Sequence, residues 1–345
     1  MNRLKYIIFL ISVFFSVSLV SCDQYNTDVV GEKFAPYNSL VTKFRQPVYV
    51  EYKDGKAKVW GPYADMVDVK VDDSNVYIQS DLDSLVVFAY GYAVKERDFV
   101  YHGSLSINSD GPYALYLSGL NLMSVEGPSI QSLGTKECFL VLTDKAQNRL
   151  NGQFITNGPL IIDGGGNLQI ETNDETALLA KGGLTCSYPV KVRLLSDKGD
   201  GLHVDNSDVK IADGEWTIKA GKNAISNATG QVIINGGKVY GHALNGSFVS
   251  TSSAKGLVTN ETTCIAVAGK ESSLLAEERQ FIWQAKVDTL AVSADSIIVI
   301  NRIPSSDNGN LEEIAKFKPA YNFDTPWVLI SVPSLKETDW VTFKN

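Results

Sequence analysis

The chain has 345 residues, with 39 acidic and 31 basic side chains and a formal net charge of -8 at pH 7. This acidity, without any dense run of Lys or Arg, argues against nucleic acid as a partner, because phosphate backbones are bound by concentrated positive charge. A chain of this length can bury a large core without a disulfide framework.

The first residues have the features of an export signal. Arg3 and Lys5 form a short basic head, and an uncharged apolar run follows from Tyr6 to Val20. That run is shorter than the about 20 apolar residues of a membrane span, so residues 1–21 are predicted to be a signal peptide. The small residues before Cys22 resemble a lipobox. They predict lipid on Cys22 and an exported protein held at the outer membrane or cell surface by its acyl chains alone. The alternative is an ordinary secretory signal that ends near a cysteine.

Two regions precede the repeat described below. Residues 22–46 start with a polar stretch and are predicted to be a tether. Residues 47–104 alternate apolar and polar side chains, as in Val48 to Tyr52 and Val67 to Val71, which is typical of short strands. An uncovered solenoid end would pair with other chains, so this region is predicted to be an N-terminal β cap.

An internal repeat of about 24 residues dominates the middle of the chain. Short segments align without gaps, and one apolar residue recurs in them at spacings of 24, 24, 24, 23 and 23. These residues are Ile130, Phe154, Leu178, Leu202, Ile225 and Phe248. A single coil of this kind cannot bury its own core. The repeat therefore predicts an all-β fold, a right-handed parallel β-helix over residues 105–255, with coils about 4.8 Å apart.

Two further apolar columns keep step with the first. The second consists of Cys138, Ile162, Cys186, Ile211 and Ile234, and the third includes Leu168, Trp216 and Val239. Trp216 is therefore expected in the core. Cys138 and Cys186 would lie about 9 to 10 Å apart along the stack, too far for a disulfide, so both are interpreted as buried apolar residues.

The 24-residue step ends near residue 255, while strand-like stretches continue. They include Thr289 to Val292, Ser296 to Ile300 and Trp327 to Leu335. Residues 256–345 are predicted to be a C-terminal β cap on the last coils.

Several motifs, in this order along the chain, resemble the bacterial β-helical family of carbohydrate-binding domain-containing proteins. They are Leu117–Leu122 (LSGLNL), Gly127–Ser132 (GPSIQS), Asn148–Gly152 (NRLNG), Gly199–Leu202 (GDGL), Ile234–Gly237 (INGG) and Leu329–Leu335 (LISVPSL). The resemblance covers roughly residues 85–345. It implies a β-helix and a carbohydrate ligand, and a described clostridial relative binds polygalacturonic acid.

The chain also departs from that family. The repeated Asp-Gly-Ile turn survives only as Asp200-Gly201-Leu202, and it becomes Thr176-Ala177-Leu178 or Asn223-Ala224-Ile225 in other coils. If the turn aspartates hold calcium in relatives, this chain offers fewer such ligands.

The most polar coil runs from residue 196 to residue 208 and contains four carboxylates. They are Asp197, Asp200, Asp205 and Asp208. Carboxylates interrupted by glycine suit a hard, oxygen-ligated cation, so the four are a candidate calcium site, and calcium is the cofactor that the sequence suggests. The alternative is a solvated acidic turn.

Three polar or aromatic residues are candidates for carbohydrate contact. Thr217 and Tyr240 fall in an outward column, where an exposed ring could stack on a sugar, and His203 lies in the acidic coil. The competing expectation for Tyr240 is pairing across strands. For His203 and His242 it is a solvated surface position.

The leading hypothesis is a non-catalytic, monomeric, surface-anchored protein that binds an acidic or neutral polysaccharide along the side of the solenoid, with calcium assisting an acidic one. A structural adhesin or scaffold with a protein partner is the first alternative. A polysaccharide lyase is the second, but Lys191, Arg193 and Lys198 show no lyase-like pairing with the aspartates. The three histidines fall in separate coils, which gives little support to a nucleophilic triad or a zinc site.

Overall fold

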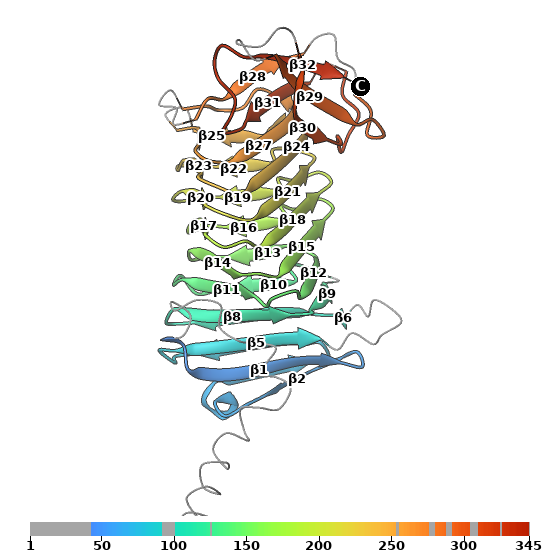
Figure 1. Ribbon diagram of the computed structural model, residues 1–345. Coiled ribbons are helices and arrows are strands. Elements are labelled where there is room, and N and C mark those ends of the chain that lie inside the picture. Colours follow the sequence, from blue (N-terminus) through green and yellow to red (C-terminus); the bar gives the residue numbers. More distant parts are fainter. Residues whose placement is uncertain are drawn as a thin grey trace, which may run out of the picture. The chain divides into compact units, whose positions relative to one another are not determined.

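The chain forms stacked coils whose strands pair in parallel with those of the next coil, as a computed structural model shows (Figure 1). The structure describes residues 43–91, 101–124, 126–252, 255–275, 280–287, 292–303, 310–324 and 326–344. The predicted signal peptide, Cys22 and most of the tether lie outside the described residues. The described part is nearly all-β, with about seven turns of about 24 residues, which confirms the predicted β-helix. None of its segments is a helix long and apolar enough to cross a membrane.

Three long sheets form the faces of the stack, and each central coil adds one strand to each sheet. Sheet A has the order β2 (Lys56–Trp60), β1 (Gln46–Lys53), β5 (Leu85–Gly91), β8 (Tyr113–Ser118), β11 (Cys138–Leu142), β14 (Leu160–Gly164), β17 (Leu184–Cys186), β20 (Val209–Ile211), β23 (Val232–Ile234) and β26 (Leu257–Thr259). Sheet B has the order β25 (Val249–Thr251), β22 (Ile225–Asn227), β19 (Leu202–Val204), β16 (Leu178–Ala180), β13 (Phe154–Thr156), β10 (Ile130–Ser132), β7 (Ser104–Ser109), β4 (Asn75–Ser80) and β3 (Asp68–Asp72).

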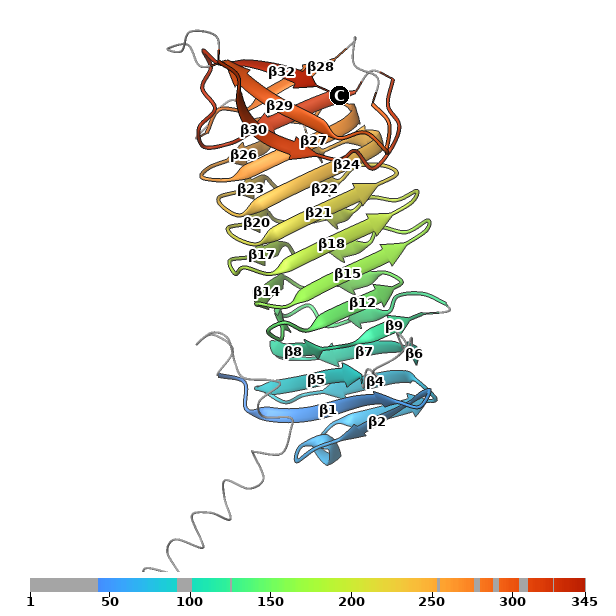
Figure 2. The same ribbon diagram turned by 45° about the vertical axis from the view of Figure 1, so that its right-hand side comes forward.

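Sheet C is the face that leads to the candidate site, and Figure 2 shows its strands from β12 to β21 one above another. Its order is β28 (Trp283–Lys286), β31 (Trp327–Ser331), β27 (Thr263–Lys270), β24 (Lys238–Ser247), β21 (Glu215–Ala220), β18 (Lys191–Ser196), β15 (Asn167–Thr172), β12 (Gln147–Asn151), β9 (Asn121–Met123) and β6 (Tyr101–His102).

The first predicted column of apolar residues is confirmed from Ile130 to Ile225, since each member pairs with the next in sheet B. Its last predicted member is wrong, because Ile225 pairs with Val249 and not with Phe248. Phe248 is nevertheless fully buried. Its ring packs so closely on Gly241 that a Cβ added to this glycine would lie 2.1 Å from Cδ2 of the ring. Because Phe248 and Val249 are adjacent and both apolar, the sequence pattern alone does not show which of them pairs in register with Ile225.

The second column is confirmed from Ile162 to Ile234, but it starts at Leu140 and not at Cys138. Cys138 pairs with Leu160, which is 22 residues further along the chain, so a constant 24-residue step places it two residues off. The third column is confirmed, with Val192 between Leu168 and Trp216. Trp216 is fully buried, as predicted.

The cysteines of the described chain are buried and free. Cys138, Cys186 and Cys264 form no disulfide with one another. Burial raises the pKa of the Cys138 and Cys186 thiols to about 12 and raises the pKa of Cys264 as well. The reactive thiolate is therefore suppressed, and these residues serve as apolar core.

Antiparallel strands close the N-terminal end of the stack. β1 pairs in parallel with β5 and antiparallel with β2, and β3 pairs antiparallel with β4. A short 3₁₀ turn, η2 (Ala64–Met66), separates β2 from β3. Parallel pairing thus begins at β1 and β4, earlier than the predicted start at residue 105. The hairpins occupy backbone groups that an open first coil would leave free to pair with other chains.

The C-terminal end is covered in the same manner. Parallel pairing continues past residue 255 through β26 and β27, after which β31 pairs antiparallel with β27 and β28 with β31. A separate antiparallel sheet consists of β30 (Glu312–Phe317), β29 (Ile298–Ile303) and β32 (Trp340–Lys344). Its apolar residues share a second core with β27 and β31. All described residues belong to one compact unit of the chain.

Candidate functional site

The corner where sheet C passes into sheet B differs in length from coil to coil. β12 ends at Asn151 and β13 begins at Phe154, so only Gly152 and Gln153 turn this corner. In the preceding coil β9 ends at Met123 and β10 begins at Ile130, and in the following coil β15 ends at Thr172 and β16 begins at Leu178, so both of these corners are longer. The short corner is therefore recessed between two longer ones.

A groove of about 910 Å³ lies over this short corner, and we call it the corner groove. Ser124, Gly127 and Pro128 line it from the preceding coil, and residues 151–153 line it from the short corner itself. Residues 171–175 line it from the following coil. Unequal corner lengths thus create a concave surface on a stack that would otherwise be regular.

One row of lining residues follows the stack. Met123 pairs with Asn151, Asn151 with Glu171, and Glu171 with Leu195, so neighbouring strands of sheet C each contribute one outward side chain. Adjacent strands lie about 4.8 Å apart, which makes the row about 14 Å long. The groove is therefore suited to an elongated ligand that runs along the stack and meets apolar and polar side chains in turn.

Gly152 allows the backbone to pass close to the preceding coil. Its φ is +134°, and an added Cβ would lie 2.6 Å from the Ser129 hydroxyl oxygen. The Ser129 hydroxyl donates a hydrogen bond to the Asn151 carbonyl oxygen at 3.0 Å. Glycine is required here by both conformation and space, so the short corner is fixed by its sequence.

Three amide side chains of the groove are available to a ligand. Asn151, Gln153 and Asn173 line the groove, and none of their side-chain amides has a hydrogen-bond partner within the described residues. The backbone carbonyl oxygens of the same three residues, by contrast, are engaged. They accept hydrogen bonds from the backbone N–H groups of Ser124, Ser129 and Lys198 at 3.0, 2.9 and 2.8 Å, respectively. The backbone is thus held by the fold while the side chains remain free.

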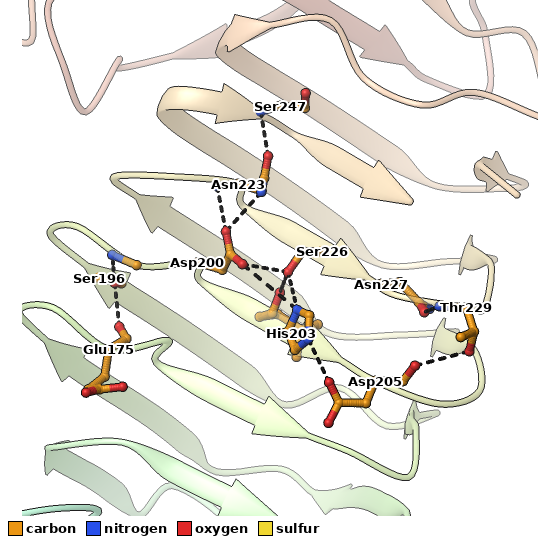
Figure 3. A network of polar contacts seen from close by, with 12 residues as sticks. Glu175, Ser196, Asp200, His203, Asp205, Asn223, Ser226, Asn227, Thr229 and Ser247 are labelled. Carbon is orange, nitrogen blue, oxygen red and sulfur yellow. Dashed lines mark hydrogen bonds and ion pairs between the residues drawn. The ribbon is translucent and has the colours of Figure 1, made fainter. Parts of the chain in front are cut away.

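Hydroxyl groups hold the longer corner of the following coil. Thr172 and Ser196 each donate a hydrogen bond at 2.7 Å to the carbonyl oxygen of Glu175, and the latter contact is drawn in Figure 3. The Ser196 hydroxyl also accepts from the N–H of Gly199 at 2.8 Å. This wall of the groove is therefore fixed before any ligand arrives.

The charged residues of the lining are all acidic: Glu171, Asp174, Glu175 and Asp197. Two of them have cationic partners outside the lining, since Glu171 pairs with Arg149 at 3.0 Å and Asp174 with Lys198 at 2.6 Å. The hydrogen bond and charge of Asp174 raise the pKa of the exposed Lys198. Within the described residues, Glu175 and Asp197 have no ion-pair partner.

Asp200 organises a polar network in the following corners (Figure 3). Its carboxylate accepts hydrogen bonds from the backbone N–H of Asn223 at 2.8 Å and from the Ser226 hydroxyl at 2.7 Å. The side chain of Asn223 in turn accepts from the N–H of Ser247 at 3.0 Å. Successive coils are therefore linked by side chains as well as by strand pairing.

His203 lies between Ser226 and Asp205 in a pattern that resembles a Ser-His-Asp triad. Nδ1 is 2.6 Å from the Ser226 hydroxyl oxygen and Nε2 is 2.8 Å from an Asp205 oxygen. Ser226 has a single hydroxyl hydrogen, however, and the Asp200 carboxylate, which only accepts, takes it at 2.7 Å. With that hydrogen directed to Asp200, the Nδ1 contact is a hydrogen bond only in the form of His203 that carries a hydrogen on Nδ1. The arrangement therefore links neighbouring coils through their side chains.

The structure does not gather the four aspartates of the candidate calcium site. Asp200 and Asp205 bind the partners described above. Asp208 accepts from the N–H of Gln231 at 3.0 Å and lies 3.7 Å from Lys210. Asp197 is exposed in the lining of the corner groove. Over the part of the chain that the structure describes, no group of three or more His, Cys, Asp or Glu side chains could hold a metal ion.

A model of the carbohydrate-binding domain-containing protein family matches residues 99–303, which is more than half of the chain. The chain belongs to the carbohydrate-binding domain-containing protein family. The corner groove lies entirely within the matched residues. No curated protein and no solved structure matches the chain. Membership of the family suggests a carbohydrate-binding role.

In this family member, the outward candidates Thr217 and Tyr240 lie next to each other in sheet C, opposite one another in register. Tyr240 is half-buried and packs against the second core near the C-terminal end. Burial, and then the charge of Glu215, raise its pKa. Its ring is therefore partly used for packing, and neither residue lines the corner groove.

His242 does not have the solvated surface position that the sequence suggests. It is 4% exposed, and its Nδ1 accepts a hydrogen bond from the backbone N–H of Ala320 at 3.2 Å. Burial, with a smaller contribution from Lys219, lowers its pKa to about 4. The segment around Ala320 therefore covers this end of sheet C. Such a long-range contact cannot be predicted from the local sequence pattern.

An outward row of aromatic rings on sheet A is a second feature that the sequence reading missed. Trp60, Tyr49, Phe88 and Tyr116 follow one another in register. Their ring centroids are 4.5, 5.2 and 4.7 Å apart, with interplanar angles of 24°, 17° and 39°. Tyr49 and Phe88 thus cover each other and are covered on their other faces by the outer rings. The row stabilises the first coils and offers no free inner ring face to a sugar.

Proposed function

We propose that the protein is a non-catalytic carbohydrate-binding protein that holds a polysaccharide in the corner groove. The observation that carries this proposal is a concave, polar groove on the solenoid, inside the region that matches a carbohydrate-binding family. Its row of outward residues runs along the stack, so an extended glycan would meet several coils at once.

The lining offers the two kinds of contact that a sugar needs. The free amides of Asn151, Gln153 and Asn173 can donate to and accept from hydroxyl groups. Met123 and Leu195 stand in the same row and present apolar surface to the C–H groups of a sugar ring. Because the backbone around them is already hydrogen-bonded, little ordering is required on binding.

The residue types of the groove favour binding over bond cleavage. A lyase needs a basic side chain next to the proton that it removes, and the described lining contains no Lys, Arg or His. The Ser226 hydroxyl donates to Asp200, which favours a structural role for it over that of a nucleophile. The proposed binding does not involve calcium. If a glycan screen finds no ligand, an adhesin that recognises a protein partner is the alternative function.

Export and lipid attachment at Cys22 complete the proposed function. A signal peptide over residues 1–21 and the tether that follows would leave the solenoid, as a monomer, at the outer membrane or cell surface. Its position there is supported by the charge and hydropathy pattern of the first 22 residues.

The test is a glycan array followed by titration of the bound glycan against a double variant, Asn151→Ala with Gln153→Ala. Each lost hydrogen bond is worth about 0.5–1.5 kcal/mol, so binding should weaken about tenfold or more. A matched control is Gln147→Ala with Asn167→Ala, which removes a paired Gln and Asn from the opposite end of β12 and β15. Equal affinity of the double variant and the control, at unchanged melting temperature, would contradict a binding role for the groove.

A further inference from the structure

We infer that the corner groove selects its glycan by charge, accepting neutral and amine-bearing sugars and rejecting sugars that carry carboxylates. This inference rests on the proposed function, because it names the class of ligand for the same groove. It differs from the expectation that the clostridial resemblance carries, in which the ligand is a polyuronate.

The first step is the balance of charge in the lining. Glu171, Asp174, Glu175 and Asp197 contribute four carboxylates, and no described lining residue is basic. Arg149 and Lys198 approach from outside, but each is already within ion-pair distance of one carboxylate. The charge of Asp197 also acts on Lys198, but Glu175 has no ion-pair partner among the described residues and two cations face four carboxylates, so the groove as a whole retains negative charge.

The second step is the position of the remaining cations on sheet C. Arg193 stands on β18 two residues before the lining residue Leu195, and its register partner on β21 is Thr217. Burial, and then the charges of Arg193 and Lys318, lower the pKa of Lys219. Lys219 is the register partner of the lining residue Leu195, so these cations flank the groove at its end toward the C-terminal cap. They do not enter its lining.

The third step is the interaction of a bound sugar with the carboxylates of the groove. A carboxylate on a uronic acid would lie near Glu175 and Asp197 with no lining cation to offset it, and each such approach weakens binding. A neutral sugar instead donates its hydroxyl hydrogens to these acceptors, and such charge-assisted hydrogen bonds are stronger than neutral ones. A protonated amino sugar would also gain an ion pair.

The experiment compares oligosaccharides of one backbone and equal length: β-1,4-linked glucose, glucosamine and glucuronic acid. With the full-length wild-type protein at low salt, we expect glucosamine to bind most tightly, glucose next, and glucuronic acid at least about tenfold more weakly than glucose. High salt should narrow these differences, because exposed charges are screened.

Glu175→Gln with Asp197→Asn should bring the three affinities together, since it keeps the size of both side chains and removes their charge. The control is Glu137→Gln with Asp144→Asn, which changes the net charge equally at exposed positions outside the lining and should leave the order intact. Tighter binding of glucuronic acid than of glucose, or an unchanged order of the three affinities in the groove variant, would overturn charge selection but not the proposed function. If none of the three oligomers binds and a broad array also finds no glycan, the proposed function falls and this inference with it.

Discussion

Ser226→Ala tests whether the network around His203 holds coils together or performs chemistry. Ser226 is 7% exposed, donates to Asp200 at 2.7 Å and lies 2.6 Å from Nδ1 of His203. A hydrogen bond to a charged group contributes about 1.5–3 kcal/mol and a neutral one about 1 kcal/mol. The variant should therefore lower the free energy of unfolding by about 2–4 kcal/mol.

Urea unfolding followed by circular dichroism measures this loss, as a midpoint shift of about 1 M or more for the m-values typical of proteins. Hydrogen exchange should quicken at the backbone amide of Asn223, which donates to Asp200. Ser250→Ala is the matched control, because Ser250 is the next residue of the same outward row. If Ser226→Ala is as stable as the control, the network does not hold the coils together. If it abolishes an esterase activity of the wild type toward an activated ester, our assignment of the hydroxyl hydrogen is wrong.

Three further predictions concern the core, pH and the anchor. Leu202→Asp places an unpaired charge in a fully buried column, which costs several kcal/mol, and should abolish the β-rich circular dichroism spectrum. His242 is neutral in the folded protein down to about pH 4, whereas the unfolded chain protonates it below about pH 6.5. Stability should therefore fall by up to about 3 kcal/mol as pH drops through that window. His242→Asn, which keeps an acceptor for Ala320, should flatten this dependence in melting curves at stepped pH. Cys22→Ser should move the protein from the membrane fraction to the soluble fraction, and a mutant that stays on the membrane with its signal cleaved would contradict lipid attachment.

The sequence predicted the coils because strand pairing imposes a constant step on inward residues. Leu178 and Leu202 are 24 residues apart and are register partners, and each must be apolar to fill the same column. The predicted register is wrong by two residues where two neighbouring coils have corners of different lengths. The coil that contains Cys138 has a long corner at residues 143–146 and the short one at residues 152–153, and the next coil has the reverse arrangement. The two coils have the same total length, so the 24-residue period does not reveal that the long and the short corner have changed places.

The candidate site was missed for the same reason, although the sequence contains its signal. The last inward residue of sheet C and the first of sheet B are four positions apart at Leu150 and Phe154, but eight apart at Ile170 and Leu178. Counting each corner separately would have exposed the recess. The aspartates and His203 were found, but their partners, such as Ser226, come from the next coil and depend on exact register. The burial of His242 depends on Ala320, which is 78 residues away in sequence.

The unequal corners have a consequence for how such a protein can evolve. An insertion of a few residues between Gly152 and Gln153 would fill the groove, yet it would leave every buried apolar column in place. Deletion at the neighbouring corner, residues 173–177, would lengthen the recess by one strand spacing, about 4.8 Å. The core and the shape of the groove are therefore encoded by different residues, and under the proposed function the preferred glycan can change coil by coil while the core stays the same.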